Sequence, residues 1–189
     1  MLHLRSPTPS AWLEHALAHI DEVLVDHAHC EKKAASTAIS LLSSYPDNVP
    51  LATAMASLAA EEADHLRRVV EALHARGRTL GKDPGDPYAQ QLLALVRGGD
   101  ERLLDRLLVS ACIEARSCER LKLLADHLAD PALKALYTDL FAAEAGHFRM
   151  FTDLARSMFG EERTRIRLDA LLDAEDRIVA ALPVRSVVH

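Results

Sequence analysis

The sequence predicts an all-α protein in which four long helices form a bundle, with a crossover between the second and third helices and extra helices at the N- and C-terminal ends. Apolar residues make up 49% of the chain, aromatic residues only 4%, and glycine occurs 7 times, a composition that favours helices over strands. Proline- and glycine-containing turns divide the chain into long segments whose apolar residues recur at steps of three and four. The length indicates a single domain, residues 1–189.

The first two helices are delimited by proline-containing turns. Ser10 is expected to cap a helical region over residues 11–44, with a break near Asp21. A Tyr-Pro-Asp-Asn turn follows. Pro50 then suits the first turn of the second helix, where its missing N–H costs no hydrogen bond. This helix is expected to end at Gly77.

The crossover is expected over residues 77–99, where glycine and proline flank a short helix at about residues 87–97. A connection of this length can bring the third helix parallel to the second. Bundles with one long crossover are ferritin-like, and the core bundle is placed at about residues 21–160.

The remaining helices begin at recognisable caps. Asp100 is expected to cap the third helix, which reaches about residue 129. The Asp-Pro pair at 130–131 combines a cap with a proline in the first turn and opens the fourth helix, which ends at Gly160. A C-terminal helix is expected at about residues 161–182.

Charge and cysteine usage exclude several classes of protein. With 22 basic and 28 acidic residues the net charge is −6, so the chain is not a polycation that coats nucleic acid. Three cysteines without a Cys-x-x-Cys motif argue against a disulfide framework and a thiolate zinc site. No apolar run approaches the roughly 20 residues of a membrane span. A cytoplasmic protein without membrane association is expected.

Ionisable residues interrupt the apolar stripe of each long helix near its middle. The first and third helices each contribute one glutamate, and the second and fourth each contribute a Glu-x-x-His pair. The six residues are Glu31, Glu62, His65, Glu114, Glu144 and His147. A further pair, Glu71 and His74, lies nine residues after the pair at 62–65, which at about 100° per residue is half a turn, and is predicted to be exposed.

The six residues form two matched halves. Glu31 and Glu114 are separated by 83 residues, and Glu62 and Glu144 by 82. Two helix pairs related by a pseudo-twofold axis would therefore bring all six side chains to one depth in the core. One Glu from each of two helices and a Glu-x-x-His pair from each of the others is the ligand set of ferritin-like di-iron and di-manganese proteins.

Four carboxylates inside an apolar bundle require cations, because an uncompensated buried ion costs several kcal/mol. Two divalent ions would balance the four charges, and carboxylate and imidazole ligands suit iron or manganese. In the usual geometry of such sites, Glu62 and Glu144 bridge the metals, Glu31 and Glu114 are terminal ligands, and each histidine binds one metal.

Some residues near the predicted ligands could have either a functional or a purely structural role. His27, one turn before Glu31, is either a second-layer partner of the site or an ordinary half-exposed histidine. Cys118 is expected to be a small buried residue, and Tyr137 a core residue. Basic residues gather in the crossover and after the fourth helix, and they are the available electrostatic footprint for a nucleic acid.

Four segments resemble the bacterial tRNA hydroxylase family called MiaE. They are Thr8-Pro-Ser-Ala-Trp-Leu, Asp26-His-Ala-His-Cys-Glu-Lys-Lys-Ala-Ala-Ser-Thr-Ala, Glu61-Glu62-Ala-Asp-His65 and Glu144-Ala-Gly-His147. The resemblance extends to about residue 182 and includes all six ligand positions of the family pattern.

The resemblance implies a non-haem di-iron monooxygenase that hydroxylates the isopentenyl group of 2-methylthio-N6-isopentenyladenosine, next to the anticodon in tRNA. It implies two iron ions, cycling between Fe2+ and Fe3+ in a catalytic centre held by the six residues, together with O2 and externally supplied electrons. The implied partners are tRNA and an electron-donating reductase. Side chains provide no oxidant for an unactivated methyl group, so the metal centre must carry the chemistry.

Two other classes remain open from the sequence. A ferritin- or rubrerythrin-like protein that oxidises iron or scavenges peroxide would share the same six ligands. Rubrerythrin-type electron transfer also needs an iron held by four cysteine thiolates, and the chain has three cysteines. A metal-free scaffold bundle is the remaining alternative.

Overall fold

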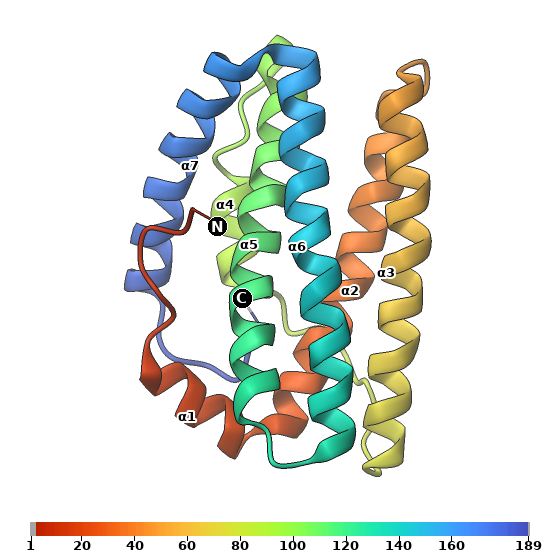
Figure 1. Cartoon of the computed structure of the whole chain (residues 1–189), viewed down its shortest axis with the longest axis vertical. Coiled ribbons are helices and arrows are strands. Elements are labelled where there is room, and N and C mark those ends of the chain that lie inside the picture. The colour runs from red at the N-terminus through yellow and green to blue at the C-terminus, as the bar shows by residue number, and fades with distance from the viewer. Residues whose placement is uncertain (1–2, 189) are drawn as a thin grey trace.

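The computed structural model describes residues 3–188 and confirms the all-α fold (Figure 1). Four long helices lie along the long axis of the molecule, and three shorter ones lie against them. The long helices are α2 (Ile20–Ser44), α3 (Val49–Ala75), α5 (Arg102–His127) and α6 (Pro131–Phe159); the others are α1 (Ser10–Ala18), α4 (Pro87–Leu93) and α7 (Glu161–Ala181).

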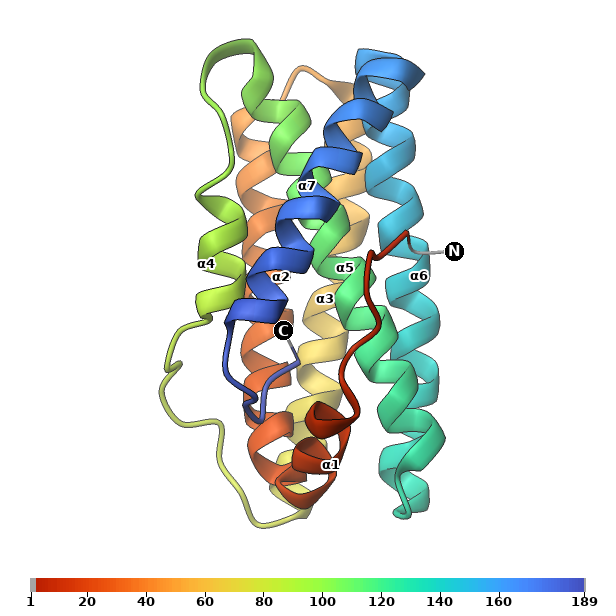
Figure 2. The same cartoon turned by 90° about the vertical axis from the view of Figure 1, so that its left-hand side faces the viewer.

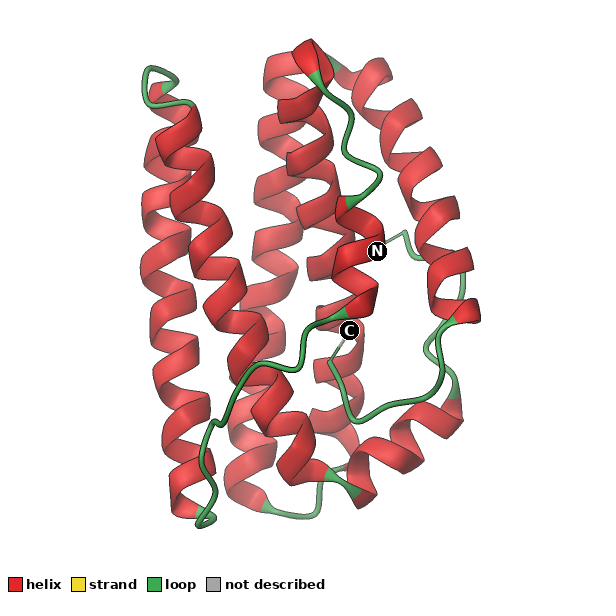
Figure 3. Ribbon diagram, turned by 180° about the vertical axis from the view of Figure 1, so that it is seen from behind, coloured by secondary structure: helices red, strands yellow, loops and turns green. Residues whose placement is uncertain are grey.

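The connection between α3 and α5 is the predicted crossover. Figure 2 shows the chain leaving α3 at the lower end of the bundle and returning along its outside through α4 to the upper end, where α5 begins. Helix α5 therefore runs parallel to α3. The antiparallel pairs α2–α3 and α5–α6 face each other in the ferritin-like arrangement. In the described part of the chain, all regular structure is helical (Figure 3).

Several helix ends follow the predicted caps. The Asp130 carboxylate accepts hydrogen bonds from the backbone N–H groups of Ala132 and Leu133, as expected for the start of α6. Pro50 lies in the first turn of α3, and the break in the first helical region falls at His19, close to the predicted position.

Two predicted caps are wrong. Asp100 lies in a 3-10 turn, Gly99–Glu101, and α5 begins after it without a side-chain cap. Ser10 is the first residue of α1, not its cap. The short crossover helix ends at Leu93 instead of near residue 97, because the chain then turns so that the backbone N–H and side chain of Arg97 reach the buried Asp105.

The apolar core is divided into two clusters at opposite ends of the bundle. One contains Met55, Leu107 and Phe151, and the other contains Leu24 and Leu73, each with many neighbours. In α2, α3 and α6 the predicted ionisable residues fall between the segments that belong to the two clusters, and in α5 Glu114 lies near the end of the first cluster's segment, directly before Ala115. The bundle therefore holds a polar layer between two apolar regions.

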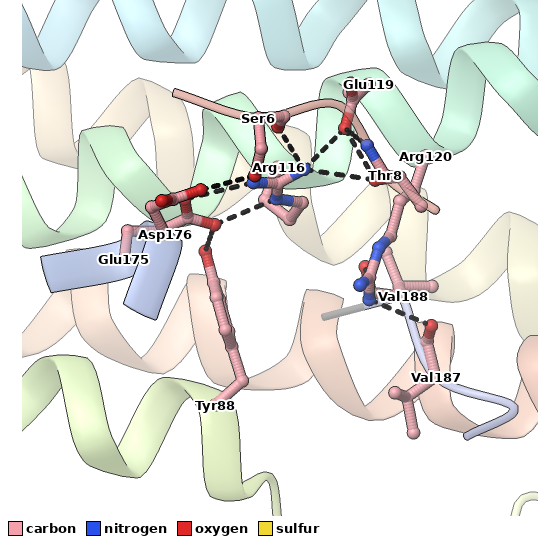
Figure 4. Close-up of polar contacts among 10 residues, drawn as sticks. All are labelled: Ser6, Thr8, Tyr88, Arg116, Glu119, Arg120, Glu175, Asp176, Val187 and Val188. Carbon is pink, nitrogen blue, oxygen red and sulfur yellow. Dashed lines mark hydrogen bonds and ion pairs between the residues drawn. The ribbon is translucent and has the colours of Figure 1, made fainter. Parts of the chain in front are cut away.

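Both ends of the chain are fastened to the outer face of α5 (Figure 4). The fully buried Arg116 donates to both carboxylate oxygens of Glu175 in α7, at 2.8 and 3.0 Å, and the Tyr88 hydroxyl in α4 donates to the same carboxylate. Arg120 lies over the Trp12 ring at 4.7 Å and donates to the backbone carbonyl of Val188. These contacts hold α1, α4, α7 and the C-terminal residues against the bundle.

Among the described residues, no helix combines the length and apolar character that crossing a bilayer requires.

Candidate metal centre

The six predicted residues converge in the polar layer. Each exposes at most 7% of its surface, although all six are ionisable. They come from the four long helices: Glu31 from α2, Glu62 and His65 from α3, Glu114 from α5, and Glu144 and His147 from α6. The helical periodicity predicted that all six face the core, because each lies on the apolar stripe of its helix, and the matched spacing of the two halves predicted their common depth.

The ligand atoms form two overlapping groups. Atoms of Glu31, Glu62, His65 and Glu144 lie within 4.8 Å of one another, and so do atoms of Glu62, Glu114, Glu144 and His147. Glu62 and Glu144 belong to both groups. This is the position expected of carboxylates that bridge two ions.

The two imidazoles face each other, with ring centroids 5.9 Å apart. Nδ1 of His147 lies 3.1 Å from Oε1 of Glu62 and 3.4 Å from Oε2 of Glu144. Nδ1 of His65 lies 3.4 Å from Oε2 of Glu62. Both histidines therefore present Nδ1 to the carboxylates.

The inward-facing atoms lack hydrogen-bond partners. Both oxygens of Glu62, Oε2 of Glu144 and the Nδ1 atoms of His65 and His147 are buried, and no described residue forms a hydrogen bond of acceptable geometry with them. Buried polar atoms are nearly always hydrogen-bonded, so this concentration of exceptions needs an explanation. Carboxylate oxygens and imidazole nitrogens gathered at one point fit iron or manganese ions.

Protons compensate part of the charge of this layer when no metal is bound. Burial and the neighbouring Glu144 carboxylate raise the pKa of Glu31 and of Glu114 well above the usual range. Burial also opposes ionisation of Glu62, but its interactions with His147 and His65 lower its pKa. Metal ions bind the deprotonated groups, so their binding would release these protons.

The same interactions act on the histidine of α6. Burial disfavours the charged imidazole, but Glu144 and Glu62 raise the pKa of His147 to about 11. The carboxylates of Glu144 and Glu62 therefore favour positive charge at this point in the bundle.

His27 lies beside the centre and is buried, which excludes the half-exposed interpretation. Its Nε2 is 2.7 Å from Oε1 of Glu31, and its ring stacks on Tyr137 with centroids 5.4 Å apart. Cys118 is buried, as expected, and its thiol donates to the Phe141 carbonyl. Glu71 and His74 are exposed, as their helical phase predicted.

Glu61 is a neighbour of the centre that the sequence pattern did not single out. Its Oε2 lies 3.0 Å from Nε2 of His147, on the side of the ring away from the ligand atoms. The Glu61 side chain is 57% exposed and lies off the apolar stripe of α3, so periodicity gives no sign of its role. Only its position directly before Glu62 could have suggested it.

A cavity of about 340 Å³ reaches the polar layer from the side of α2, α4 and α5. Three carboxylates line its inner part: Glu31, Glu114 and Glu144. Apolar side chains, among them Leu58, Ile113 and Phe151, form much of its wall.

Polar groups also line this cavity, and Arg106 is the notable cation among them. Its guanidinium donates to the hydroxyls of Ser40 and Ser44, at 3.0 and 3.4 Å. Within residues 3–188, no carboxylate forms an ion pair with Arg106, and burial lowers its pKa.

The whole chain, residues 1–189, matches the protein family described as tRNA-(MS[2]IO[6]A)-hydroxylase (MiaE). A Pseudomonas putida protein named tRNA 2-(methylsulfanyl)-N(6)-isopentenyladenosine(37) hydroxylase is 41% identical over 174 residues, covering 92% of this chain and 84% of that protein. A Salmonella typhimurium protein of the same name is 30% identical over 223 residues, covering 91% and 82%.

A solved structure, named Protein 43 with aldehyde deformylating oxygenase activity from Synechococcus, has the same fold. It superposes with a TM-score of 0.94 at 40% sequence identity, covering 98% of this chain and 94% of that chain.

Proposed function

Because the chain belongs to the MiaE family of tRNA hydroxylases, we propose that it hydroxylates the isopentenyl group of 2-methylthio-N6-isopentenyladenosine, next to the anticodon in tRNA. One observation carries this proposal beyond the family match. Four buried carboxylates and two imidazoles gather in one layer, and three of these carboxylates line a largely apolar cavity. The reaction on tRNA would take place in the cytoplasm.

Two iron ions would be held by the six residues, with Glu62 and Glu144 as bridging ligands and Glu31 and Glu114 as terminal ligands. The overlap of the two ligand groups at Glu62 and Glu144 supports this division. Iron bound there would supply the activation of O2, for which side chains have no equivalent.

The overall reaction defines what the chain must receive from outside. A C–H bond, O2, two electrons and two protons give a C–OH group and water. Since the sequence shows no flavin or nicotinamide motif, the two electrons would come from an external reductase.

The cavity would bind and orient the prenyl group. Its volume of about 340 Å³ corresponds to roughly eleven water molecules at about 30 Å³ each, enough for a five-carbon chain and part of the base. Leu58, Ile113 and Phe151 would exclude water from the methyl group that reacts. A carbon held close to the centre in this way reacts without the entropic cost of a free encounter.

Arg106 is suited to hold the polar part of the substrate. The chain as a whole is acidic, so tRNA must be bound by local cations. A guanidinium that is fixed by two serine hydroxyls, and that lacks an ion-pair partner among the described residues, would contact phosphate or the base at the cavity.

The activity is tested by incubating the iron-loaded protein with reductant, O2 and prenylated tRNA. The modified nucleoside should gain the mass of one oxygen, and tRNA without the prenyl group should not. A fatty aldehyde serves as a third substrate, because the Synechococcus relative is named for activity on aldehydes. Turnover of the aldehyde without any change in the tRNA, or no turnover by protein that holds two iron ions, would refute the proposal.

Two variants separate substrate binding from metal binding. Ala34→Trp fills the cavity and should reduce hydroxylation by about a hundredfold while two metal ions remain bound. Glu62→Ala removes a ligand common to both groups and should abolish both metal binding and activity. Equal metal loss in the two variants would contradict the assignment of the cavity.

A further inference from the structure

The pseudo-twofold relation allows each residue around the polar layer to be compared with its counterpart in the other half. In α3 and α6 the Glu-x-x-His pairs correspond, so His65 is the counterpart of His147. The residue directly before the glutamate differs. It is Glu61 in α3 and Ala143 in α6.

This difference falls on the outer sides of the two imidazoles. Glu61 reaches across from α3 to α6, where its carboxylate lies 3.0 Å from Nε2 of His147. The matching position for His65 is Ala143, which has no polar group. In the range 3–188 no residue forms a hydrogen bond with Nε2 of His65, although its Nδ1 faces the same carboxylates.

A carboxylate behind a metal-bound imidazole changes that ligand. The N–H···O interaction fixes the tautomer and the ring orientation and makes the nitrogen that binds the metal a stronger donor. Only His147 has this support. The two metal positions therefore have the same ligands in kind but different electrostatic surroundings.

We propose that Glu61 is a positioning residue for His147 and that the two metal positions are unequal, with the ion beside His147 bound more tightly than the ion beside His65. This inference rests on the proposed dimetal site. The centre would then fill in two steps, with the His147 position filled first. Loss of outer partners of this kind commonly costs about ten- to hundredfold in metal affinity, and the exposure of Glu61 places its effect near tenfold.

The test is an anaerobic titration of the metal-free protein with Co2+, followed by its absorption bands and by metal content. Wild-type protein should bind two ions in two resolved steps. Glu61→Gln keeps the size and the surface position of the side chain but removes its charge, and should weaken the first step by about tenfold, so that the two steps merge. The bands of the first ion should also shift, which a purely structural role would not produce.

Ala143→Glu is the matched variant in the other half, because it supplies the carboxylate that His65 lacks. It should raise the metal affinity of the second, weaker step. The two steps should then become equal because the weaker affinity rises, whereas in Glu61→Gln they become equal because the stronger affinity falls. Glu71→Gln, on the exposed face of α3, should leave both steps unchanged.

The possible outcomes distinguish this inference from the proposed function. Two identical steps in the wild type, or an unchanged titration for Glu61→Gln, would overturn the inference and leave the dimetal site intact. Failure of the wild type to bind two ions would instead refute the site itself.

Discussion

Glu114→Gln should stabilise the metal-free protein increasingly as the pH rises. Glu114 is 7% exposed in α5, and burial together with Glu144 raises its pKa well above the usual range. In the metal-free protein it therefore carries a proton at pH values where the unfolded chain has lost it. A glutamine amide matches the protonated carboxyl in shape and in its ability to donate to Glu144.

The sign follows from proton linkage. Above the unfolded pKa of about 4.3, the folded state binds more protons than the unfolded state at Glu114, so the free energy of unfolding falls as the pH rises toward the folded pKa. The loss is about 1.4 kcal/mol per pH unit for each such group. Glu31 adds a second group of the same kind, and His147, whose pKa is also raised, adds a third above about pH 6.5, so the variant should remove about half of the slope near pH 5.5 and about a third near pH 7.

Urea denaturation in the presence of a chelator, at several pH values between 5.5 and 7, measures this slope. At the limiting slope of about 1.4 kcal/mol per pH unit, the variant should gain up to about 2 kcal/mol relative to wild type across that range, a large share of a typical stability of about 5–15 kcal/mol. Glu71→Gln on the exposed face of α3 is the control, and its free energy of unfolding should change with pH as that of wild type does. Parallel curves for Glu114→Gln and wild type would show that Glu114 is ionised in the metal-free fold and would refute the reasoning.

Other predictions concern the buried ion pairs and the metal. Arg116→Met leaves the fully buried Glu175 without its partner and should cost about 3–5 kcal/mol in urea denaturation, whereas adding Glu175→Gln should restore most of that loss. Burial opposes ionisation of Asp105, but its interactions with Arg97 and Arg167 lower its pKa. The stabilisation from these ion pairs is therefore present above the unfolded pKa of about 3.8 and is lost as the pH falls below that value. Asp105→Asn should therefore reduce the loss in the free energy of unfolding as the pH falls below about 4. The same loss in the variant and in wild type would contradict this prediction. Saturation with Fe2+ at a hundredfold excess over each Kd should add about 2.7 kcal/mol per bound ion to the free energy of unfolding, about 5.4 kcal/mol for two ions, and a chelator should reverse it.

Periodicity explains why the sequence predicted the long helices and the six converging residues. Each ligand position lies on the apolar stripe of its own helix, and the stripe fixes which face is buried whatever the exact packing. The Asp130 cap is similarly local, because a carboxylate two or three residues before free N–H groups needs no tertiary contact.

Features that depend on contacts between distant segments could not be predicted. Glu61 is an ordinary exposed glutamate until α6 brings His147 beside it. Asp100 resembles a good cap, but the chain forms a 3-10 turn there, with nearby Arg97 bonded to Asp105. Val188 is buried where its N–H donates to Asp26 and its carbonyl accepts from Arg120, two residues that lie far from it along the chain.

The division of the core shows how the fold tolerates a charged layer. Two apolar clusters, one on each side of the layer, provide the burial that holds the helices together. Because burial in these clusters stabilises the bundle, the layer between them can contain polar, metal-binding side chains.

The two sides of the layer also have different surroundings. The cavity reaches Glu31, Glu114 and Glu144, and neither histidine lines it within the described residues. Glu61 meets His147 on the outer side of the ring, away from the ligand atoms. Substrate in the cavity would therefore approach bound metals past the carboxylates. The donor strength of His147 would instead be influenced by Glu61, which lies outside the cavity. Because of this separation, a change at Glu61 should alter how the metals are held without altering the shape of the cavity, and a change at Ala34 should do the reverse.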